Sequence, residues 1–201
     1  NKMIICLGRE FGSGGHEIGK EMAQQLGIPF WDKELLDKAI EQSGMPPEHL
    51  KKVDERKVNP WLHRVWYDVQ DKRLRGKTAN EILFALQSRI ILEEAKQGDA
   101  IFVGRCADEV LRRNQIERVS LFISAPFDKR VERKMELTGK GEKEVAVLIR
   151  KTDLQRKIYY EHRTGRSWGN PSNYDCCINS ASWGVVRTAE YLADLCRRAE
   201  R

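Results

Sequence analysis

The chain has 201 residues and a formal net charge of +6, from 36 Lys and Arg against 30 Asp and Glu. This length suits one α/β domain with insertions, or two small domains. The basic residues are interleaved with acids along most of the chain, so a small polyanion such as a nucleotide fits the charge better than nucleic acid does. No apolar run approaches the roughly 18 residues of a membrane span.

The start of the chain reads directly into a strand, without the pattern of a signal peptide. Five scattered cysteines, two of them adjacent, match neither a disulfide framework nor a zinc site. We therefore expect a cytoplasmic protein with reduced thiols that binds neither nucleic acid nor membrane. The sequence leaves the oligomeric state open, and a dimer is one option.

The first apolar run, residues 3–7, predicts a buried strand, and an amphipathic pattern over residues 15–26 predicts a helix. Between them lies a glycine-rich stretch, residues 8–15. Strand, glycine loop and helix are the setting in which backbone N–H groups surround phosphates. A tight turn without a ligand is the alternative.

This stretch departs from the Walker A motif, Gly-x-x-x-x-Gly-Lys-Ser/Thr. Gly15 stands where the lysine belongs, His16 follows it, and the spacing from Gly8 to Gly14 is one residue too long. Arg9 is a candidate for the missing positive charge. The Ser13 hydroxyl is a candidate for binding phosphate or a metal ion.

The second apolar run, residues 28–31, ends at Asp32. Ligands of open parallel sheets bind outside the carboxyl ends of the strands. Asp32 can therefore accept a hydrogen bond from a sugar or base, or it can simply cap the helix predicted over residues 33–42. The segment 33–99 reads as a helical insertion rather than a long loop.

Within that insertion we expect helices over residues 47–56 and 78–96. Thr78 and Glu81, three residues apart, form the signature of a capping box at the start of the second one.

The third predicted strand, residues 100–103, leads into Gly104 and Arg105. Glycine permits close approach of a ligand to the backbone, and arginine grips a phosphate through two parallel N–H donors. We expect Arg105 to bind a ligand. Asp108 either orients Arg105 or caps the short helix that follows.

The remaining pattern alternates strand and helix, which predicts a parallel sheet with helical crossovers. Strands are expected over residues 119–123 and 176–178, and helices over residues 127–136, 142–163 and 184–198. The basic stretch from Arg150 to Arg166 reads either as a helix with internal ion pairs or as a mobile flap over a phosphate site.

Taken in order, these motifs resemble the cytidylate kinase-like proteins, bacterial relatives of cytidylate kinase among the P-loop kinases. The resemblance rests on residues 8–18, 27–35, 103–105, 150–166 and 173–180. It implies one α/β domain with the three-layer P-loop kinase fold, spanning residues 1–201. The implied sheet has five parallel strands in the order 2-3-1-4-5, with helices on both faces. Residues 33–99 would be the acceptor-binding insertion and residues 142–173 a lid-like segment.

The resemblance also assigns roles to residues. The donor phosphates would be wrapped by Gly8, Gly12, Ser13, Gly14, Gly15 and His16. The catalytic cations would be Arg9, Arg156, Lys157 and Arg163. The acceptor nucleotide would be bound by Asp32, Arg105, Asp108 and Asp175.

The implied activity moves the γ-phosphoryl group of ATP, with Mg²⁺, to a nucleoside monophosphate such as CMP or dCMP, or to a related small acceptor. The missing lysine supports an alternative, a catalytically weak or inactive nucleotide-binding or sensor protein. A gain in rate in Gly15→Lys would place this position beside the β- and γ-phosphates.

Overall fold

The computed structural model describes residues 2–44, 48 and 75–199. Its centre is a parallel sheet of five strands in the order β2-β3-β1-β4-β5, as the resemblance implies. The predicted strand positions are confirmed to within two residues at each end. The strands are β1 (Ile4–Arg9), β2 (Phe30–Trp31), β3 (Ala100–Val103), β4 (Val119–Ser124) and β5 (Cys176–Asn179).

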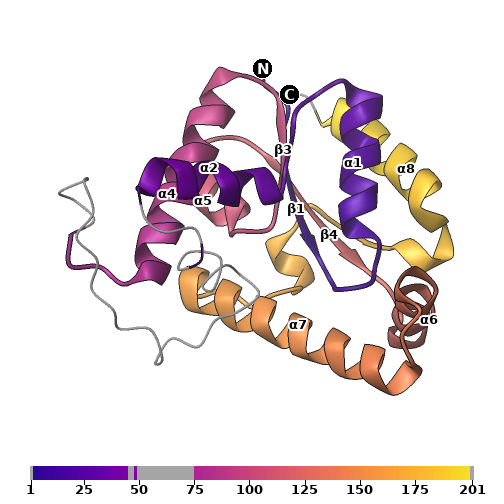
Figure 1. The fold of residues 1–201 in the computed structure, drawn as a ribbon. Helices are drawn as coiled ribbons and strands as arrows, with labels where there is room; N and C mark the ends of the chain where they lie inside the picture. Colours follow the sequence, from indigo (N-terminus) through magenta and orange to yellow (C-terminus); the bar gives the residue numbers. More distant parts are fainter. Residues whose placement is uncertain (1, 45–47, 49–74, 200–201) are drawn as a thin grey trace.

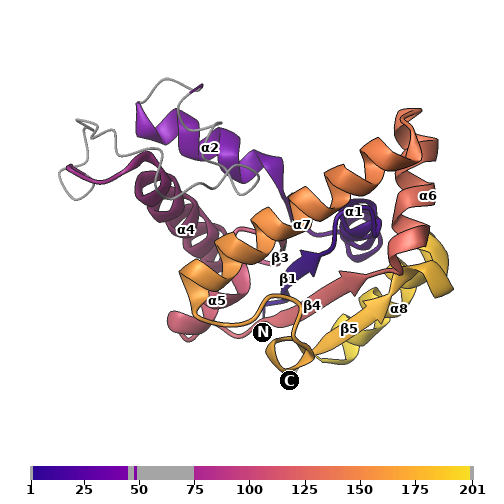
Figure 2. The ribbon, with the colours of Figure 1, turned by 90° about the horizontal axis from the view of Figure 1, so that it is seen from below.

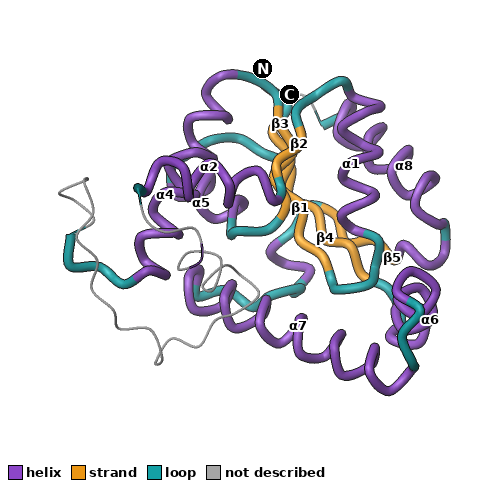
Figure 3. Tube along the Cα trace, in the orientation of Figure 1, coloured by secondary structure: helices purple, strands orange, loops and turns teal. Residues whose placement is uncertain are grey.

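Helices cover both faces of the sheet, as Figures 1 and 3 show. All the helices predicted within the described residues are confirmed, with ends shifted by two residues at most. They are α1 (Gly15–Leu26), α2 (Lys33–Ser43), α4 (Ala79–Gln97), α5 (Ala107–Arg113), α6 (Phe127–Thr138), α7 (Glu142–Thr164) and α8 (Gly184–Arg198). The helix predicted over 47–56 lies outside the described residues, apart from residue 48.

Two apolar layers hold the helices on the sheet. On one face, Ile18 and Met22 of α1 and Leu192 of α8 pack against β1, β3 and β4. On the other face, α2, α4 and α5 pack on β1 and β3 through side chains such as Leu35 and Leu86. Each of these five side chains is at least 98% buried. This burial supplies most of the driving force for the arrangement.

Helix α7 runs across the carboxyl ends of the strands, from the α4 and α5 side to α6 (Figure 2). β1 begins, and α8 ends, at the opposite edge of the sheet (Figure 1). The loops after β1, β2 and β3 therefore lie beneath α7, so that residues distant in the sequence meet there. Among the described residues, no helix has the length and apolar content needed to cross a membrane.

Candidate functional site

The glycine loop joins β1 to α1 at this carboxyl edge. Gly12 and Gly14 have φ of +87° and +81°, a region that side chains rarely adopt. A Cβ on Gly12 would lie 3.1 Å from the Arg130 carbonyl oxygen of α6, so the loop also needs glycine for packing. The first turn of α1 begins at Gly15, and its N–H groups and dipole favour an anion there.

The side chain of Arg9 fills the space beside Gly15. A Cβ built on Gly15 would lie 2.5 Å from the Arg9 Cβ and 2.8 Å from its Cγ. A lysine at residue 15 therefore collides with Arg9, so the rate of Gly15→Lys alone does not report whether residue 15 lies beside the phosphates. Arg9 also lines the cleft in front of the loop.

Ser13 supports the loop from behind. Its hydroxyl donates to the Glu10 carbonyl oxygen at 2.8 Å, and the Ser180 hydroxyl donates to the Ser13 carbonyl oxygen at 2.5 Å. Ser13 is buried and lines neither of the two cavities described below. Its hydroxyl thus stabilises the loop backbone, and the possible role of Ser13 as a metal ligand gains no support.

An open cleft of about 330 Å³ lies in front of the loop. Arg156 of α7 donates to the Arg9 carbonyl oxygen at 3.1 Å, so these two cations from opposite ends of the chain meet at the cleft wall. Helix α6 adds Arg133 and Lys134, which the sequence interpretation missed. Their spacing from Arg130, three and four residues, places all three on one helix face and was the available signal.

Asp153 of α7 ties the loop to both α6 and α7. One carboxylate oxygen accepts from the Phe11 backbone N–H at 2.7 Å, and the other accepts from Arg130 at 2.5 Å. Arg130 also donates to the Phe11 carbonyl oxygen at 3.2 Å. The loop conformation therefore depends on contacts with α6 and α7.

Asp32 contacts both Arg105 and His16. Its Oδ1 accepts from Arg105 Nη1 at 2.6 Å, and its Oδ2 lies 2.6 Å from His16 Nδ1. The side chains of Asp32 and Arg105 are at least 96% buried, whereas that of His16 is 47% exposed. Although Asp32 holds the N-cap position of α2, its side chain makes no capping hydrogen bond.

The backbone that carries Arg105 is strained. Gly104, Arg105 and Cys106 have φ of +71°, +53° and +56°, so two residues with side chains follow a glycine in the left-handed region. Each such residue costs about 1–2 kcal/mol. Strain of this kind persists where the surroundings fix it, and it clusters at functional sites. Here it turns Arg105 back toward Asp32.

Behind Arg9 and Arg105 lies a second, smaller cavity of about 30 Å³, room for little more than one water molecule. Tyr160 donates to Asp108 across its wall at 2.6 Å. Burial raises the pKa of Asp108, although the hydrogen bond from Tyr160 opposes this. Tyr159, Trp168 and Tyr174 add aromatic side chains to its lining.

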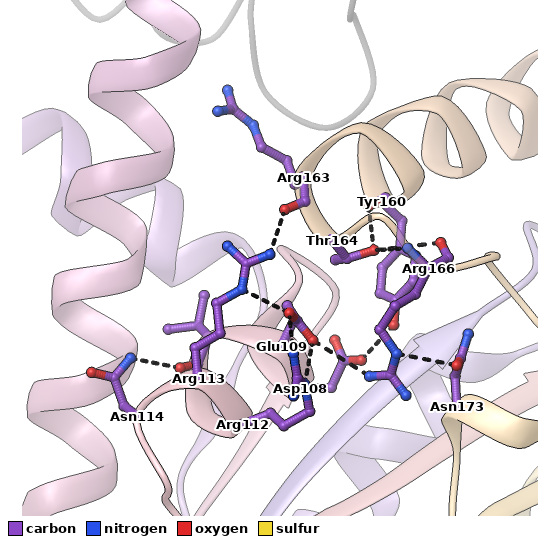
Figure 4. Close-up of polar contacts among 11 residues, drawn as sticks. Asp108, Glu109, Arg112, Arg113, Asn114, Tyr160, Arg163, Thr164, Arg166 and Asn173 are labelled. Atoms are coloured by element: carbon purple, nitrogen blue, oxygen red, sulfur yellow. Dashed lines mark hydrogen bonds and ion pairs between the residues drawn. The ribbon is translucent and has the colours of Figure 1, made fainter.

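The carboxyl end of α7 is fastened to α5 beside this cavity (Figure 4). Buried Glu109 accepts hydrogen bonds from Arg112 at 2.8 Å and from Arg113 at 2.7 Å, and pairs with Arg166 at 3.4 Å. Arg113 in turn donates to the Arg163 carbonyl oxygen at 3.2 Å. Hydrogen bonds from Arg112 above all lower the pKa of Glu109 to about 2.

The structure brings five of the predicted catalytic and acceptor-site residues together at the two cavities: Arg9, Arg156, Asp32, Arg105 and Asp108. Of the loop residues, Gly8 lines the smaller cavity, and Gly12, Gly14, Gly15 and His16 line the open cleft.

Three predicted residues lie elsewhere. Lys157 is exposed on α7 and lines neither cavity. Arg163 packs over Phe84 and donates to the Asn80 carbonyl oxygen, which joins α7 to α4. Asp175 precedes β5, at the amino edge of the sheet, and accepts from the Ser120 N–H at 2.7 Å.

A five-stranded parallel sheet in this order, with a glycine loop after its central strand, defines the fold of the P-loop kinases. Solved structures agree over nearly the whole chain. A shikimate kinase from Bacteroides thetaiotaomicron has 18% identity and a TM-score of 0.57, and covers 98% of this chain and 99% of its own. A gluconokinase from Sinorhizobium meliloti has 16% identity and a TM-score of 0.57, and the match covers 100% of this chain and 98% of the gluconokinase.

The model of the cytidylate kinase-like family matches residues 4–182, and this chain belongs to that family. A crystal structure of an uncharacterized protein from Eubacterium ventriosum is 27% identical, with a TM-score of 0.72 and complete coverage of both chains. A search among curated proteins finds no match.

Proposed function

We propose that this protein is a phosphotransferase that moves the γ-phosphoryl group of ATP to a small acceptor. The family name makes CMP and dCMP the first acceptors to test. The observation that carries the proposal is the meeting of Arg9, Arg156 and the first turn of α1 at one cleft, with the Asp32–Arg105 pair at its other side.

Phosphoryl transfer needs positive charge on the transferring group and fixed positions for both partners. On this proposal, the loop N–H groups and Arg9 hold the β- and γ-phosphates, where other P-loop kinases use lysine. Arg156, Arg133 and Lys134 face the same cleft from α6 and α7 and stabilise the charge of the transition state. Asp32, anchored by Arg105, lines the same cleft and orients the acceptor.

The described residues do not form a dedicated magnesium site. They contain no group of three or more His, Cys, Asp or Glu side chains that could hold a metal ion, and the Ser13 hydroxyl donates to the loop backbone. Magnesium commonly binds through substrate phosphates with few protein ligands. We therefore expect Mg²⁺ to enter as its complex with ATP.

An ADP-release assay over a panel of nucleoside monophosphates and small hydroxyl compounds tests the proposal. Turnover that falls by roughly 100-fold or more in Arg9→Met and Arg156→Met is the expected result, the scale of losing one strong transition-state contact. The exposed Arg187 provides a matched control, Arg187→Met, which should keep the wild-type rate. Absence of turnover above background with every acceptor, in folded protein, would exclude the proposal.

Gly15 itself favours a second candidate, a nucleotide sensor without phosphotransferase activity, because both the Walker lysine and the following hydroxyl are missing. A sensor would be stabilised by ATP, since a ligand that binds only the folded state raises the melting temperature. It would show that shift with no phosphorylated product. ATP binding accompanied by steady turnover rules the sensor out.

A further inference from the structure

His16 and Asp32 form a hydrogen-bonded pair at the boundary between the glycine loop and the acceptor side. We propose that His16 is the general base that takes a proton from the acceptor, and that the acceptor atom is therefore a hydroxyl oxygen rather than a phosphate oxygen. This inference rests on the proposed phosphotransferase function and names its acceptor class.

The hydrogen bond fixes the proton on the imidazole. An ionised carboxylate only accepts hydrogen bonds, so at 2.6 Å from Asp32 Oδ2 the His16 Nδ1 must be the donor. In the neutral ring Nε2 then carries a lone pair and can accept a proton. A base oriented by a carboxylate through its other nitrogen is the arrangement by which enzymes activate hydroxyl nucleophiles.

The surroundings hold this pair in place. Arg105 donates to the other oxygen of Asp32 at 2.6 Å, so the carboxylate cannot rotate away from the imidazole. Phe30 packs edge-on against the ring, with centroids 5.3 Å apart. The His16 side chain is 47% exposed and lines the open cleft with Arg9 and Arg156, so its free edge faces the space where phosphoryl transfer is proposed.

The chemistry separates two acceptor classes. The phosphate of a nucleoside monophosphate is already ionised near pH 7, since its second pKa is about 6, and it needs no base. A hydroxyl keeps its proton until attack. A positioned base that removes this proton contributes typically 10²- to 10⁴-fold in rate. A histidine oriented by a carboxylate in the cleft therefore assists transfer to a hydroxyl, whereas transfer to a phosphate does not require it.

In transfer to an acceptor R–OH, the O–H bond breaks and its proton moves to His16 Nε2, while the oxygen forms a bond to the γ-phosphorus of ATP. The bond from that phosphorus to the bridging oxygen breaks, and its electron pair leaves with ADP. His16 then returns the proton to solvent.

The charged groups that share the cleft with His16 come from several elements. They are Lys33 on α2, Arg9 on β1, Glu17 on α1, Arg133 and Lys134 on α6, and Arg156 on α7, while Asp32 and Arg105 lie behind the ring. A general base acts only in its unprotonated form. We expect kcat/KM to fall on acidification as His16 takes up a proton.

The test compares three variants. His16→Gln keeps a hydrogen-bond donor toward Asp32 but removes the base, and His16→Arg supplies a permanent cation. His162→Gln, at an exposed histidine in the last turn of α7, is the matched control. The probes are water, as ATP hydrolysis, and the pairs cytidine with CMP and deoxycytidine with dCMP, which offer the same nucleoside with and without the phosphate.

The proposal predicts that His16→Gln and His16→Arg lower hydrolysis, and any transfer to a nucleoside hydroxyl, by at least 10-fold in kcat with little change in the KM for ATP. Both variants should lose the acid limb of the pH profile, and His162→Gln should keep it. Phosphorus NMR of any transfer product should show a phosphate ester.

Three results would overturn the inference while leaving the phosphotransferase function standing. They are full activity in His16→Gln, full activity in His16→Arg, which would make His16 a cation rather than a base, and a phosphoanhydride product from CMP or dCMP. Failure of the wild-type protein to hydrolyse ATP or to phosphorylate any probe would instead count against the proposed function itself.

Discussion

At the scale of single residues, Asp32 occupies a helix N-cap position, but its side chain contacts residues of the candidate site and does not cap the helix. An aspartate at the N-cap of a helix usually accepts from the first-turn N–H groups. Here its oxygens bind Arg105 and His16, and the cap of α2 makes no side-chain hydrogen bond. Such a departure from local preference is typical of functional positions, and only the pairing partners reveal which role Asp32 has.

Gly15 and Arg9 provide a prediction at the same scale. Gly15→Lys should lower the free energy of unfolding by about 1–3 kcal/mol, the usual cost of overpacking, because the new Cβ meets Arg9. Urea unfolding measures this. The double variant Arg9→Gly with Gly15→Lys should recover part of this loss, since only glycine at residue 9 removes the Cβ that lies 2.5 Å from the new one. A single Gly15→Lys variant as stable as the wild type would contradict the packing described for this loop.

At the scale of elements, the start of α4 is determined by a capping box that the sequence alone predicts. Thr78 accepts from the Glu81 N–H, and Glu81 accepts from the Thr78 N–H at 2.8 Å, so the capping box is confirmed. The N–H and the hydroxyl of Thr78 both donate to the Glu81 carboxylate and lower its pKa. Both partners are three residues apart, which is why sequence alone suffices.

Thr78→Ala should therefore lower the free energy of unfolding by about 1 kcal/mol, the typical value of an N-cap. Thermal and urea unfolding provide the measurement. Thr78→Ser keeps the hydroxyl and is the control expected to stay close to the wild type. If alanine and serine behave alike, the capping box does not stabilise α4.

Glu109 connects two elements and gives a pH dependence. Its pKa is lowered to about 2 in the folded protein, chiefly by Arg112 and then by Arg113. A group whose folded pKa is depressed contributes stability above its unfolded pKa, near 4.3, and this is lost as pH falls toward the folded value.

Acid titration of the unfolding free energy tests this. Between about pH 4.5 and pH 2 the wild type should lose about 1–2 kcal/mol more than Glu109→Gln; this figure is discounted because Arg112 and Arg113 are half exposed. Parallel titration curves for the two proteins would show that the ionised Glu109 contributes nothing to stability.

At the scale of the whole molecule, Asp153 joins the glycine loop to α6 and α7. Asp153→Asn replaces one acceptor oxygen by an N–H group, so that either Phe11 or Arg130 loses its partner. Leaving a buried polar group unpaired costs about 1–3 kcal/mol. We expect lower stability and a smaller rise of the melting temperature with ATP than in the wild type.

Differential scanning fluorimetry over a range of ATP concentrations measures both effects, since the shift follows the ratio of ATP to its Kd. Lys157→Ala, on the exposed face of the same helix, is the control. An unchanged ATP response in Asp153→Asn would mean that the loop binds nucleotide independently of the helix pair.

Sequence alone determined the strand and helix positions, the glycine loop, the capping box and the candidates Asp32 and Arg105. These depend on periodicity, turn residues and strand ends, which are local properties. The sheet order came from the family resemblance. The roles of residues 33–99 as an insertion and 142–173 as a lid stay predictions.

Tertiary structure alone decided which candidates meet. Arg156 reaches Arg9 because α7 crosses the carboxyl edge of the sheet, whereas Lys157, one residue along, points elsewhere since successive helix residues lie about 100° apart. The proximity of Gly15 to Arg9 and of His16 to Asp32 likewise arises from folding. Periodicity determines the elements of this protein, but contacts between distant residues depend on how those elements pack, and packing determines the site.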